Sequence, residues 1–308
     1  MKLPGGVPFR LLPALLLAAV LPARGEPPRL TVEAIPERPR QGDVFLLVLR
    51  SDRPLDALTA VDGERRAPLV AAEGARVFRG LVGIDFESAA GSRAFSLEAV
   101  AGETKSAAPW RVDVRPGRFI VQKLSVDPKF VEVPEAERER VKADQALVAA
   151  VWKSPDEARH WTMPFVKPVP APSQGNFGAK RVYNGQTRSR HAGLDLSAPT
   201  GTPVAASGAG RVALSQDLYF SGGTVILDHG GGLFTMYFHL SRRDAKEGEM
   251  VAAGARIGAV GATGRVTGPH LHWAARLHGA RVNPAALLSL PSAETPAVKP
   301  RAKSLDID

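Results

Sequence analysis

The 308-residue sequence contains no cysteine. This absence excludes disulfide bonds, a thiolate nucleophile, thiolate metal ligands and lipid attachment through cysteine. Any metal in the protein must therefore be held by histidine and carboxylate side chains. Aromatic residues make up only 6% of the chain, whereas 30 glycines and 26 prolines interrupt it every few residues. Such punctuation favours short strands and turns over long helices.

Beyond the first 25 residues the sequence has no long apolar run. The N-terminal segment combines a basic start, an apolar run and two small residues: Lys2, Arg10, Leu11 to Val20, Ala23 and Gly25. This pattern predicts a signal peptide over residues 1–25, cleaved before Glu26, with an uncleaved anchor as the alternative. The run is short for a transmembrane helix. We expect an exported protein of the periplasm or cell envelope, or a secreted one, without an integral membrane span after cleavage.

Long runs of one charge sign are also missing. The net charge is +9 and the isoelectric point is about 10, but the arginines are scattered and interleaved with acids. Nucleic-acid-binding domains usually concentrate their basic residues in a patch or stripe. We therefore expect no nucleic-acid partner. An exported basic protein would instead meet an anionic envelope polymer or a membrane surface.

The length of the chain predicts two domains. Between Leu30 and Val114, apolar and polar residues alternate in several short segments, and turn signals such as Asp62-Gly63 separate them. This alternation predicts an immunoglobulin-like β-sandwich over residues 26–116. The segment has no cluster of ionisable residues, which favours a role as a spacer or docking module.

Residues 117–175 are predicted to form a connector with one helix. Pro134 and the acidic residues after it mark the helix start, since acids are favourable near a helix N-terminus. We expect Trp152, Trp161 and Phe165 to pack one domain against the other. At the end of the chain, a segment rich in proline, alanine and lysine predicts a disordered tail over residues 291–308.

Six of the seven histidines lie after Arg190, in a second β-rich region with many glycines. His191 and Asp195 are four residues apart, and the glycine between them favours a strand on which both share one face. His270 and His272 share one face of another predicted strand. Apolar residues occupy the opposite face of each strand.

The segment from Leu233 to Leu240 is predicted as a third strand of this kind. Thr235, Tyr237 and His239 are placed on one face, where Tyr237 either lines a groove or packs as an ordinary strand residue. The other face is predicted to carry Phe234, Met236, Phe238 and Leu240. If the polar faces meet, several imidazoles and one carboxylate converge. A closed zinc site uses four ligands and a catalytic one uses three plus water, so the surplus indicates catalysis.

With these motifs in place, the segment from Phe177 to Pro284 resembles the LytM/lysostaphin-type zinc endopeptidase family. The resemblance rests on three segments in the family's order: His191-x-x-x-Asp195, Met236-Tyr-Phe-His239-Leu and Gly268-Pro-His270-Leu-His272. It covers about a third of the chain. It implies a zinc peptidase domain over residues 176–290, built on an antiparallel sheet with a groove. The predicted fold is therefore mainly β, with a sandwich and a peptidase sheet joined by the connector.

The resemblance also implies a role for each motif residue. His191, Asp195 and His272 would bind one Zn²⁺, while His239 and His270 would be catalytic. The implied function is hydrolysis of peptide cross-links of bacterial peptidoglycan, through a metal-activated water with acid and base help from histidine. Stem peptides or cross-links of the wall would be the partners.

Several alternatives remain at this stage. A non-catalytic activator of a cell-wall amidase would share the fold, and a secreted bacteriolytic glycyl-glycine endopeptidase would share the chemistry. A lipoyl-type carrier domain has similar glycine-rich hairpins, and a structural metal-binding protein would have a closed site. Three further histidines are expected to lie outside the chemistry: His229 as structural, His278 as solvated and His160 as isolated in the connector.

Overall fold

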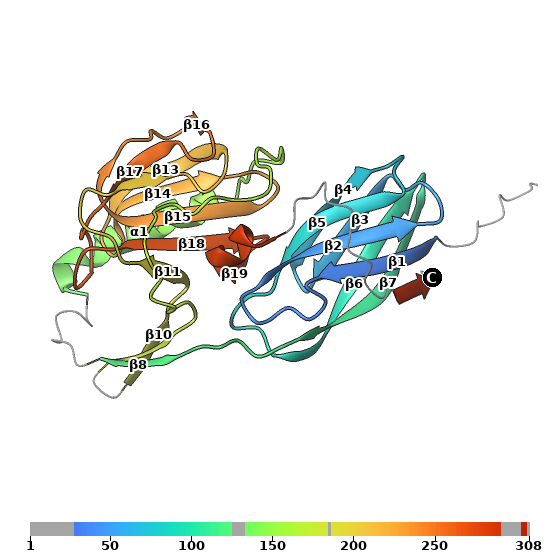
Figure 1. Ribbon diagram of the computed structural model, residues 1–308, viewed down its shortest axis with the longest axis horizontal. Helices are drawn as coiled ribbons and strands as arrows, with labels where there is room; N and C mark the ends of the chain where they lie inside the picture. The colour runs from blue at the N-terminus through green and yellow to red at the C-terminus, as the bar shows by residue number, and fades with distance from the viewer. Residues whose placement is uncertain (1–27, 125–132, 184–185, 291–302, 307–308) are drawn as a thin grey trace, which may run out of the picture.

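The computed structural model describes residues 28–124, 133–183, 186–290 and 303–306, and it contains two β-rich units side by side (Figure 1). The predicted signal peptide lies outside the described residues. Within the described ranges, no helix has both the length and the apolar character needed to cross a membrane. The prediction of a mainly β protein is confirmed.

The first unit is an eight-stranded sheet in the order β20-β1-β2-β5-β4-β3-β6-β7. Its strands are β1 (Arg29–Ile35), β2 (Val44–Ser51), β3 (Ala57–Asp62), β4 (Arg65–Ala72), β5 (Val77–Gly83), β6 (Gly91–Ala101), β7 (Thr104–Val114) and β20 (Lys303–Asp306). The sheet folds over at β4, whose first residues, Arg65–Leu69, pair with β3 and whose last residues, Val70–Ala72, pair with β5. Phe45, Phe95 and Trp110 pack between the two layers, with ring centroids 5.5–6.3 Å apart. This two-layered arrangement agrees with the predicted sandwich.

The C-terminal strand β20 differs from the prediction for this part of the chain. It pairs antiparallel with β1, with Val32 opposite Lys303 and Arg29 opposite Asp306. A disordered tail was expected over residues 291–308, yet four of its residues form a strand. The physical reason is that β1 would otherwise present an unpaired strand edge, which readily accepts another strand. Residues 291–302 and 307–308 lie outside the described ranges.

The second unit is built on a nine-stranded antiparallel sheet whose main path runs β11-β18-β15-β14-β13-β16. Its strands are β11 (Gly193–Leu196), β12 (Pro203–Ala205), β13 (Gly210–Leu218), β14 (Gly222–Asp228), β15 (Leu233–Arg243), β16 (Met250–Val251), β17 (Arg256–Val260), β18 (Leu271–Leu277) and β19 (Ala280–Val282). A small sheet beside it contains β8 (Val121–Leu124), β9 (Lys180–Tyr183) and β10 (Gln186–Arg190). β8 belongs to the predicted connector and pairs in parallel with β9.

The connector contains the one α-helix that was predicted. A 3₁₀ turn, η2 (Glu135–Glu137), follows Pro134 and leads into α1 (Arg138–Val151). Val148, Val151 and Trp152 pack on the second sheet against Leu214, Leu218, Ile226 and Phe234. Trp152 therefore lies within the second unit, with its ring 5.0 Å from that of Phe234, and not between the units as expected.

The sandwich is docked on the second unit through a shared apolar core. Val44, Val48 and Leu81 on its outer face join a cluster with Trp161 and Phe165 of the connector. The same cluster contains Leu233, Leu277, Ala280 and Val282 of the second sheet. Trp161 and Phe165 thus pack between the units as predicted. Because five apolar side chains of β2 and β5 are buried here, the sandwich is an integral part of the molecule.

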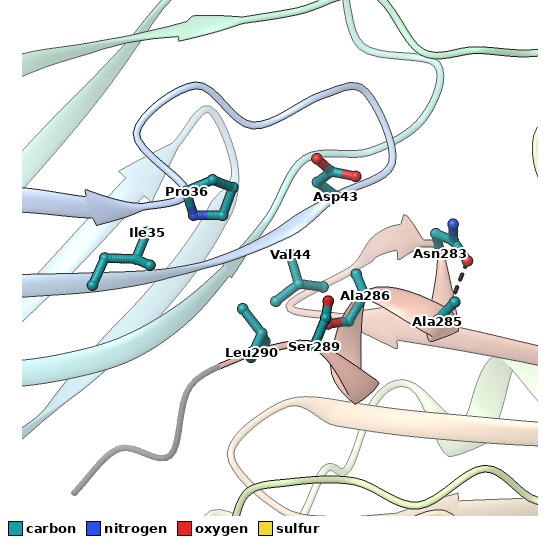
Figure 2. A pocket seen from close by; sticks show the side chains of 9 residues that line it. All are labelled: Ile35, Pro36, Asp43, Val44, Asn283, Ala285, Ala286, Ser289 and Leu290. Carbon is teal, nitrogen blue, oxygen red and sulfur yellow. Dashed lines mark hydrogen bonds between the residues drawn. The ribbon is translucent and has the colours of Figure 1, made fainter. Parts of the chain in front are cut away.

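Polar contacts fix the same interface. Arg281 donates two hydrogen bonds from its guanidinium to the Asp85 carboxylate, at 2.9 and 3.0 Å. The Asn283 backbone N–H donates to the Gly42 carbonyl at 2.7 Å. Next to this contact, the β1–β2 loop and the 3₁₀ helix η3 (Pro284–Leu288) enclose a cavity of about 490 Å³ (Figure 2). None of the five predicted site residues lines that cavity.

Candidate metal centre

Two of the three candidate metal ligands lie on adjacent strands of the second sheet, and the third lies just before one of these strands. Asp195 on β11 lies directly opposite His272 on β18, and His272 lies opposite Phe238 on β15. Cross-strand partners share one face of a sheet, so these three side chains project from the same face. His191 precedes β11 and reaches the same point from the loop after β10.

The three candidate ligand atoms form a compact triangle. His272 Nδ1 lies 2.9 Å from Asp195 Oδ1, His191 Nε2 lies 3.2 Å from the same oxygen, and the two ring nitrogens are 2.9 Å apart. Zinc bonds to nitrogen and oxygen are about 2.0 Å long, so ligand atoms around a tetrahedral ion lie about 3.3 Å apart. Two imidazoles and one carboxylate at this spacing fit a zinc ion with an open coordination position.

Small and aromatic neighbours fix the His272 ring. A Cβ atom at position 193 would lie 2.3 Å from His272 Nε2, so only glycine leaves room for the imidazole over β11. On the other side, the Phe238 ring is parallel to the His272 ring at a centroid distance of 5.1 Å. The sheet thus fixes the ring orientation before any ligand binds.

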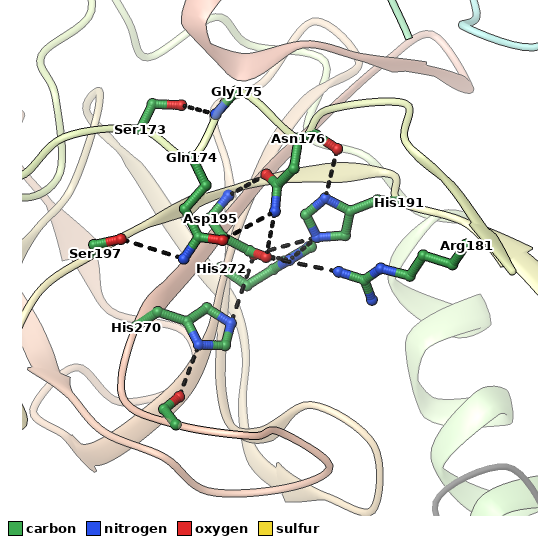
Figure 3. A network of polar contacts seen from close by, with 11 residues as sticks. Ser173, Gln174, Gly175, Asn176, Arg181, His191, Asp195, Ser197, His270 and His272 are labelled. Atoms are coloured by element: carbon green, nitrogen blue, oxygen red, sulfur yellow. Dashed lines mark hydrogen bonds and ion pairs between the residues drawn. The ribbon is translucent and has the colours of Figure 1, made fainter. Parts of the chain in front are cut away.

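Asn176 holds the other two candidate ligands, as Figure 3 shows. Its backbone carbonyl lies 3.0 Å from His191 Nδ1. A carbonyl oxygen only accepts, so Nδ1 carries the proton and Nε2 is left with its lone pair toward the centre. The Asn176 side chain donates to Asp195 Oδ2 at 2.7 Å and accepts from the Asp195 backbone N–H at 3.1 Å.

The Asp195 carboxylate is kept ionised by its surroundings. Burial alone would raise the pKa of Asp195, but the adjacent His191 and His272 rings outweigh burial and hold the pKa well below its usual range. The Arg181 guanidinium lies 3.6 Å from Asp195 Oδ2, on the side away from the ligand triangle. The carboxylate therefore presents Oδ1 to the centre while Oδ2 is held by protein groups.

The two predicted catalytic histidines lie beside the triangle. His270 Nε2 is 3.6 Å from Asp195 Oδ1, and the His239 ring centroid is 4.9 Å from that of His270 and 6.0 Å from that of His272. His270 Nδ1 faces the Gly268 carbonyl at 2.9 Å, and His239 Nδ1 faces the Thr263 carbonyl at 3.0 Å. Each ring thus donates from Nδ1, and its Nε2 is an acceptor in the neutral form. All five predicted residues therefore meet at one place.

The route by which His239 reaches this place differs from the prediction. Strand alternation was expected to put Tyr237 and His239 on one face, with Phe238 opposite. In the structure, Tyr237 lies opposite Trp273 in the core, and Phe238 is on the face of the site. His239 has a φ of 65°, a left-handed backbone conformation that breaks the alternation and turns its ring back to the site. The groove-lining alternative for Tyr237 is therefore wrong.

The local environment keeps two of the imidazoles neutral. Burial, with the nearby His272 and His270, lowers the pKa of His239 to about 3. Burial is also the largest cause for His272, whose pKa is lowered to about 4 although Asp195 acts in the opposite direction. Neutral imidazoles are the forms that bind a metal ion or accept a proton.

The other histidines serve the structure. His229 is fully buried, with Nδ1 2.8 Å from the Ala209 carbonyl and Nε2 2.7 Å from Thr235 Oγ1, as predicted for a structural residue. His160 is not isolated, because its Nε2 lies 2.8 Å from Asp156 Oδ2. His278 is half-buried and contacts the Gly231 carbonyl at 3.0 Å, so the expected solvated ring is also wrong.

Three residues of the site were not found from the sequence. Asn176 orients His191 and Asp195, Arg181 lies beside Asp195, and Thr263 holds His239 through its carbonyl. The Thr263 hydroxyl is itself bonded to the Leu240 carbonyl and the Gly223 N–H. These residues are single polar positions outside the three motifs, and no spacing or periodicity marks them.

Fold and site together define a β-sheet metallopeptidase, with a two-histidine, one-carboxylate centre on the face of an antiparallel sheet. Residues 189–284 match Peptidase family M23. A crystal structure of a peptidase M23 from Pseudomonas aeruginosa is 30% identical in sequence, covers 82% of this chain and 95% of that chain, and has a TM-score of 0.63. The chain belongs to peptidase family M23.

Curated relatives resemble part of the chain. The chain is 43% identical over 122 residues to peptidoglycan DD-endopeptidase ShyC of Vibrio cholerae, which covers 39% of this chain and 28% of that protein. It is 45% identical over 104 residues to DD-carboxypeptidase/endopeptidase Mpg of Neisseria meningitidis, which covers 34% of this chain and 24% of that protein. The alignments therefore span about a quarter of each relative.

Proposed function

We propose that the protein is a zinc-dependent endopeptidase that hydrolyses peptide cross-links of bacterial peptidoglycan. The observation that carries the proposal is the triangle of His191, Asp195 and His272 with two further imidazoles beside it. A zinc ion bound there would supply a Lewis acid and a water whose pKa is lowered to about 7. Two neutral ligands and one carboxylate would leave a net positive charge on the centre, and a three-ligand set leaves the fourth position open for water, as in catalytic zinc sites.

The chain's own groups provide the proton transfers. The Nε2 atoms of His239 and His270 are free to accept a proton, since the Nδ1 atom of each ring donates to a backbone carbonyl. A neutral imidazole can take the proton from an attacking water and return it to the leaving amine. Once protonated, such a ring would also stabilise the oxyanion that forms at the scissile carbonyl.

The proposed substrate is the D-alanyl cross-link of the cell wall. ShyC and Mpg, which resemble part of the chain, are named as peptidoglycan DD-endopeptidase and DD-carboxypeptidase/endopeptidase. The positive net charge suits an anionic polymer of the envelope. We also propose export to the envelope, which the composition of residues 1–25 supports.

The test is digestion of purified, cross-linked sacculi by the zinc-loaded protein, with the products identified by mass. Conversion of cross-linked dimers to monomers is expected. Cleavage of pentaglycine alone would identify a glycyl-glycine endopeptidase. Failure to cleave either substrate, by protein shown to contain zinc, would favour the amidase-activator alternative.

A further inference from the structure

The sandwich contributes one aromatic ring to the second unit, close to the candidate metal centre. Phe86 follows β5 and is fully buried, yet it belongs to the apolar core of the second unit and not to that of the sandwich. Its ring centroid lies 5.5 Å from the Phe177 ring and 6.2 Å from the Phe119 ring, with edge-to-face geometry in both pairs. Such pairs are more favourable than burial alone.

Two of the chain segments that contact Phe86 lead directly into the site. Phe177 immediately follows Asn176, which holds His191 and Asp195. The Arg190 guanidinium lies 5.4 Å from the centre of the Phe86 ring, and Arg190 immediately precedes His191. Phe86 is therefore in contact with the chain neighbours of Asn176 and of His191.

A second residue of the sandwich, Gly42, packs closely against the Phe177 ring. A Cβ atom at position 42 would lie 2.5 Å from Phe177 Cε1, and Gly42 has a φ of 86°, which favours glycine. The Gly42 carbonyl accepts the hydrogen bond from Asn283 that fixes the interface. The Phe177 ring is thus enclosed by the docked sandwich, through Gly42 and Phe86, and by Phe119.

We propose that the sandwich positions the metal ligands through Phe86, Phe177 and Asn176, and so sets the affinity of the centre for zinc. The zinc part of this proposal rests on the proposed function. Asn176 is the positioning residue: its carbonyl orients His191, and its amide orients Asp195. Groups that orient metal ligands typically change metal affinity by about 10–100-fold when removed.

The first experiment measures zinc affinity of the full chain by competition with a chelator. Phe86→Leu should weaken zinc binding about tenfold and Asn176→Ala by about 10–100-fold. Phe78→Leu is the matched control, because Phe78 is equally buried but packs only in the sandwich's own core. It should lower the melting temperature about as much as Phe86→Leu while zinc affinity is unchanged. Equal zinc affinities for the two leucine variants would overturn the proposal.

A double variant, Phe86→Leu with Asn176→Ala, tests whether Phe86 acts on the metal ligands through Asn176 or by a general loss of stability. If Phe86 acts through Asn176, Phe86→Leu should weaken zinc binding much less in the Asn176→Ala background than in the wild type. Independent, additive losses would show that Phe86 does not act through Asn176.

A measurement without metal distinguishes this proposal from the proposed function. The Asp195 backbone N–H donates to Asn176 Oδ1, so its hydrogen exchange reports this contact in the metal-free chain. Exchange at Asp195 should accelerate in Phe86→Leu and Asn176→Ala but not in Phe78→Leu. If this exchange pattern is observed but the chain binds no zinc, the zinc function is refuted and the positioning role is retained. Unchanged exchange in Phe86→Leu would refute the positioning role.

Discussion

Buried carboxylates of the two β units, Asp62 and Asp85 in the sandwich and Asp195 in the second unit, have different partners. In the sandwich, the buried Asp62 forms a two-point pair with Arg93, and Asp85 forms one with Arg281 of the other unit. In the second sheet, one buried carboxylate, Asp195, is surrounded by several imidazoles. A carboxylate paired with arginine is typical of a structural contact, whereas several converging imidazoles with displaced pKa values are typical of a functional site.

The difference also explains why the sandwich alone gives no indication of function. Its charged groups serve folding and docking, and its contribution to the site is made by the apolar Phe86 and by Gly42. A region can therefore support chemistry without carrying any reactive group.

The largest effect is expected from the ligand triangle. His191→Ala, Asp195→Ala and His272→Ala should each lose most bound zinc and lower hydrolysis about a thousandfold or more, since a bound metal supplies several kcal/mol of transition-state stabilisation. Metal analysis and an assay on sacculi measure both. His278→Ala, which removes a histidine outside the centre, should leave the metal bound. Full zinc occupancy in any of the three ligand variants would remove that residue from the ligand set.

His239→Ala should separate chemistry from metal binding within the same site. Because His239 lies on β15 outside the triangle, the variant should keep its zinc and its fold. The rate should fall about 10²–10⁴-fold through the loss of acid–base catalysis. Zinc content and hydrolysis are measured on the same sample. Loss of zinc together with activity would show that His239 is a ligand.

The ion pair between Asp85 and Arg281, which joins the two units, is expected to affect stability. Arg281→Met leaves the Asp85 carboxylate, 4% exposed, without its two-point partner. We expect the free energy of unfolding in urea to fall by about 2–3 kcal/mol. Arg38→Met removes a pair with Asp113 in which both side chains are more than half exposed, so its cost should be below about 0.5 kcal/mol. Similar losses in both variants would contradict the docking role of Asp85.

A smaller effect is expected from pH at a buried histidine that is not part of the site. Burial lowers the pKa of His229 to about 4 in the folded protein, whereas the unfolded chain takes up this proton near pH 6.5. Since the unfolded state binds more protons between these values, stability falls as the pH drops from about 6.5 to 4. His229 should contribute a loss of about 1 kcal/mol between pH 7 and pH 5.5. In His229→Gln the urea-unfolding free energy should depend less on pH, and an unchanged dependence would contradict this assignment.

Much of the fold and the motif residues could be predicted from the sequence. Period-two alternation located the sandwich, and the spacing of His191, Asp195, His239, His270 and His272 located the site, because both signals are local. Tyr237 was placed on the wrong face because alternation assumes regular backbone, and nothing in the sequence marks the left-handed φ of His239.

Contacts between distant segments escaped prediction for a different reason. Asn176 acts on Asp195 across 19 residues, and Asp85 pairs with Arg281 across 196. The first pair follows from the tertiary fold of the second unit and the second pair from the docking of the two units, and neither leaves a local pattern. The same holds for the strand formed by Lys303–Asp306, which depends on the edge of β1 and not on its own composition.

The most direct test of the proposed chemistry is digestion of cross-linked sacculi by zinc-loaded protein lacking residues 1–25, compared with zinc-loaded His239→Ala. The wild type should convert cross-linked dimers to monomers, and chelation should stop the reaction until zinc is restored. The variant, with zinc still bound, should cleave at most about 1% as fast. Absence of dimer cleavage by the zinc-loaded wild type would contradict the endopeptidase function.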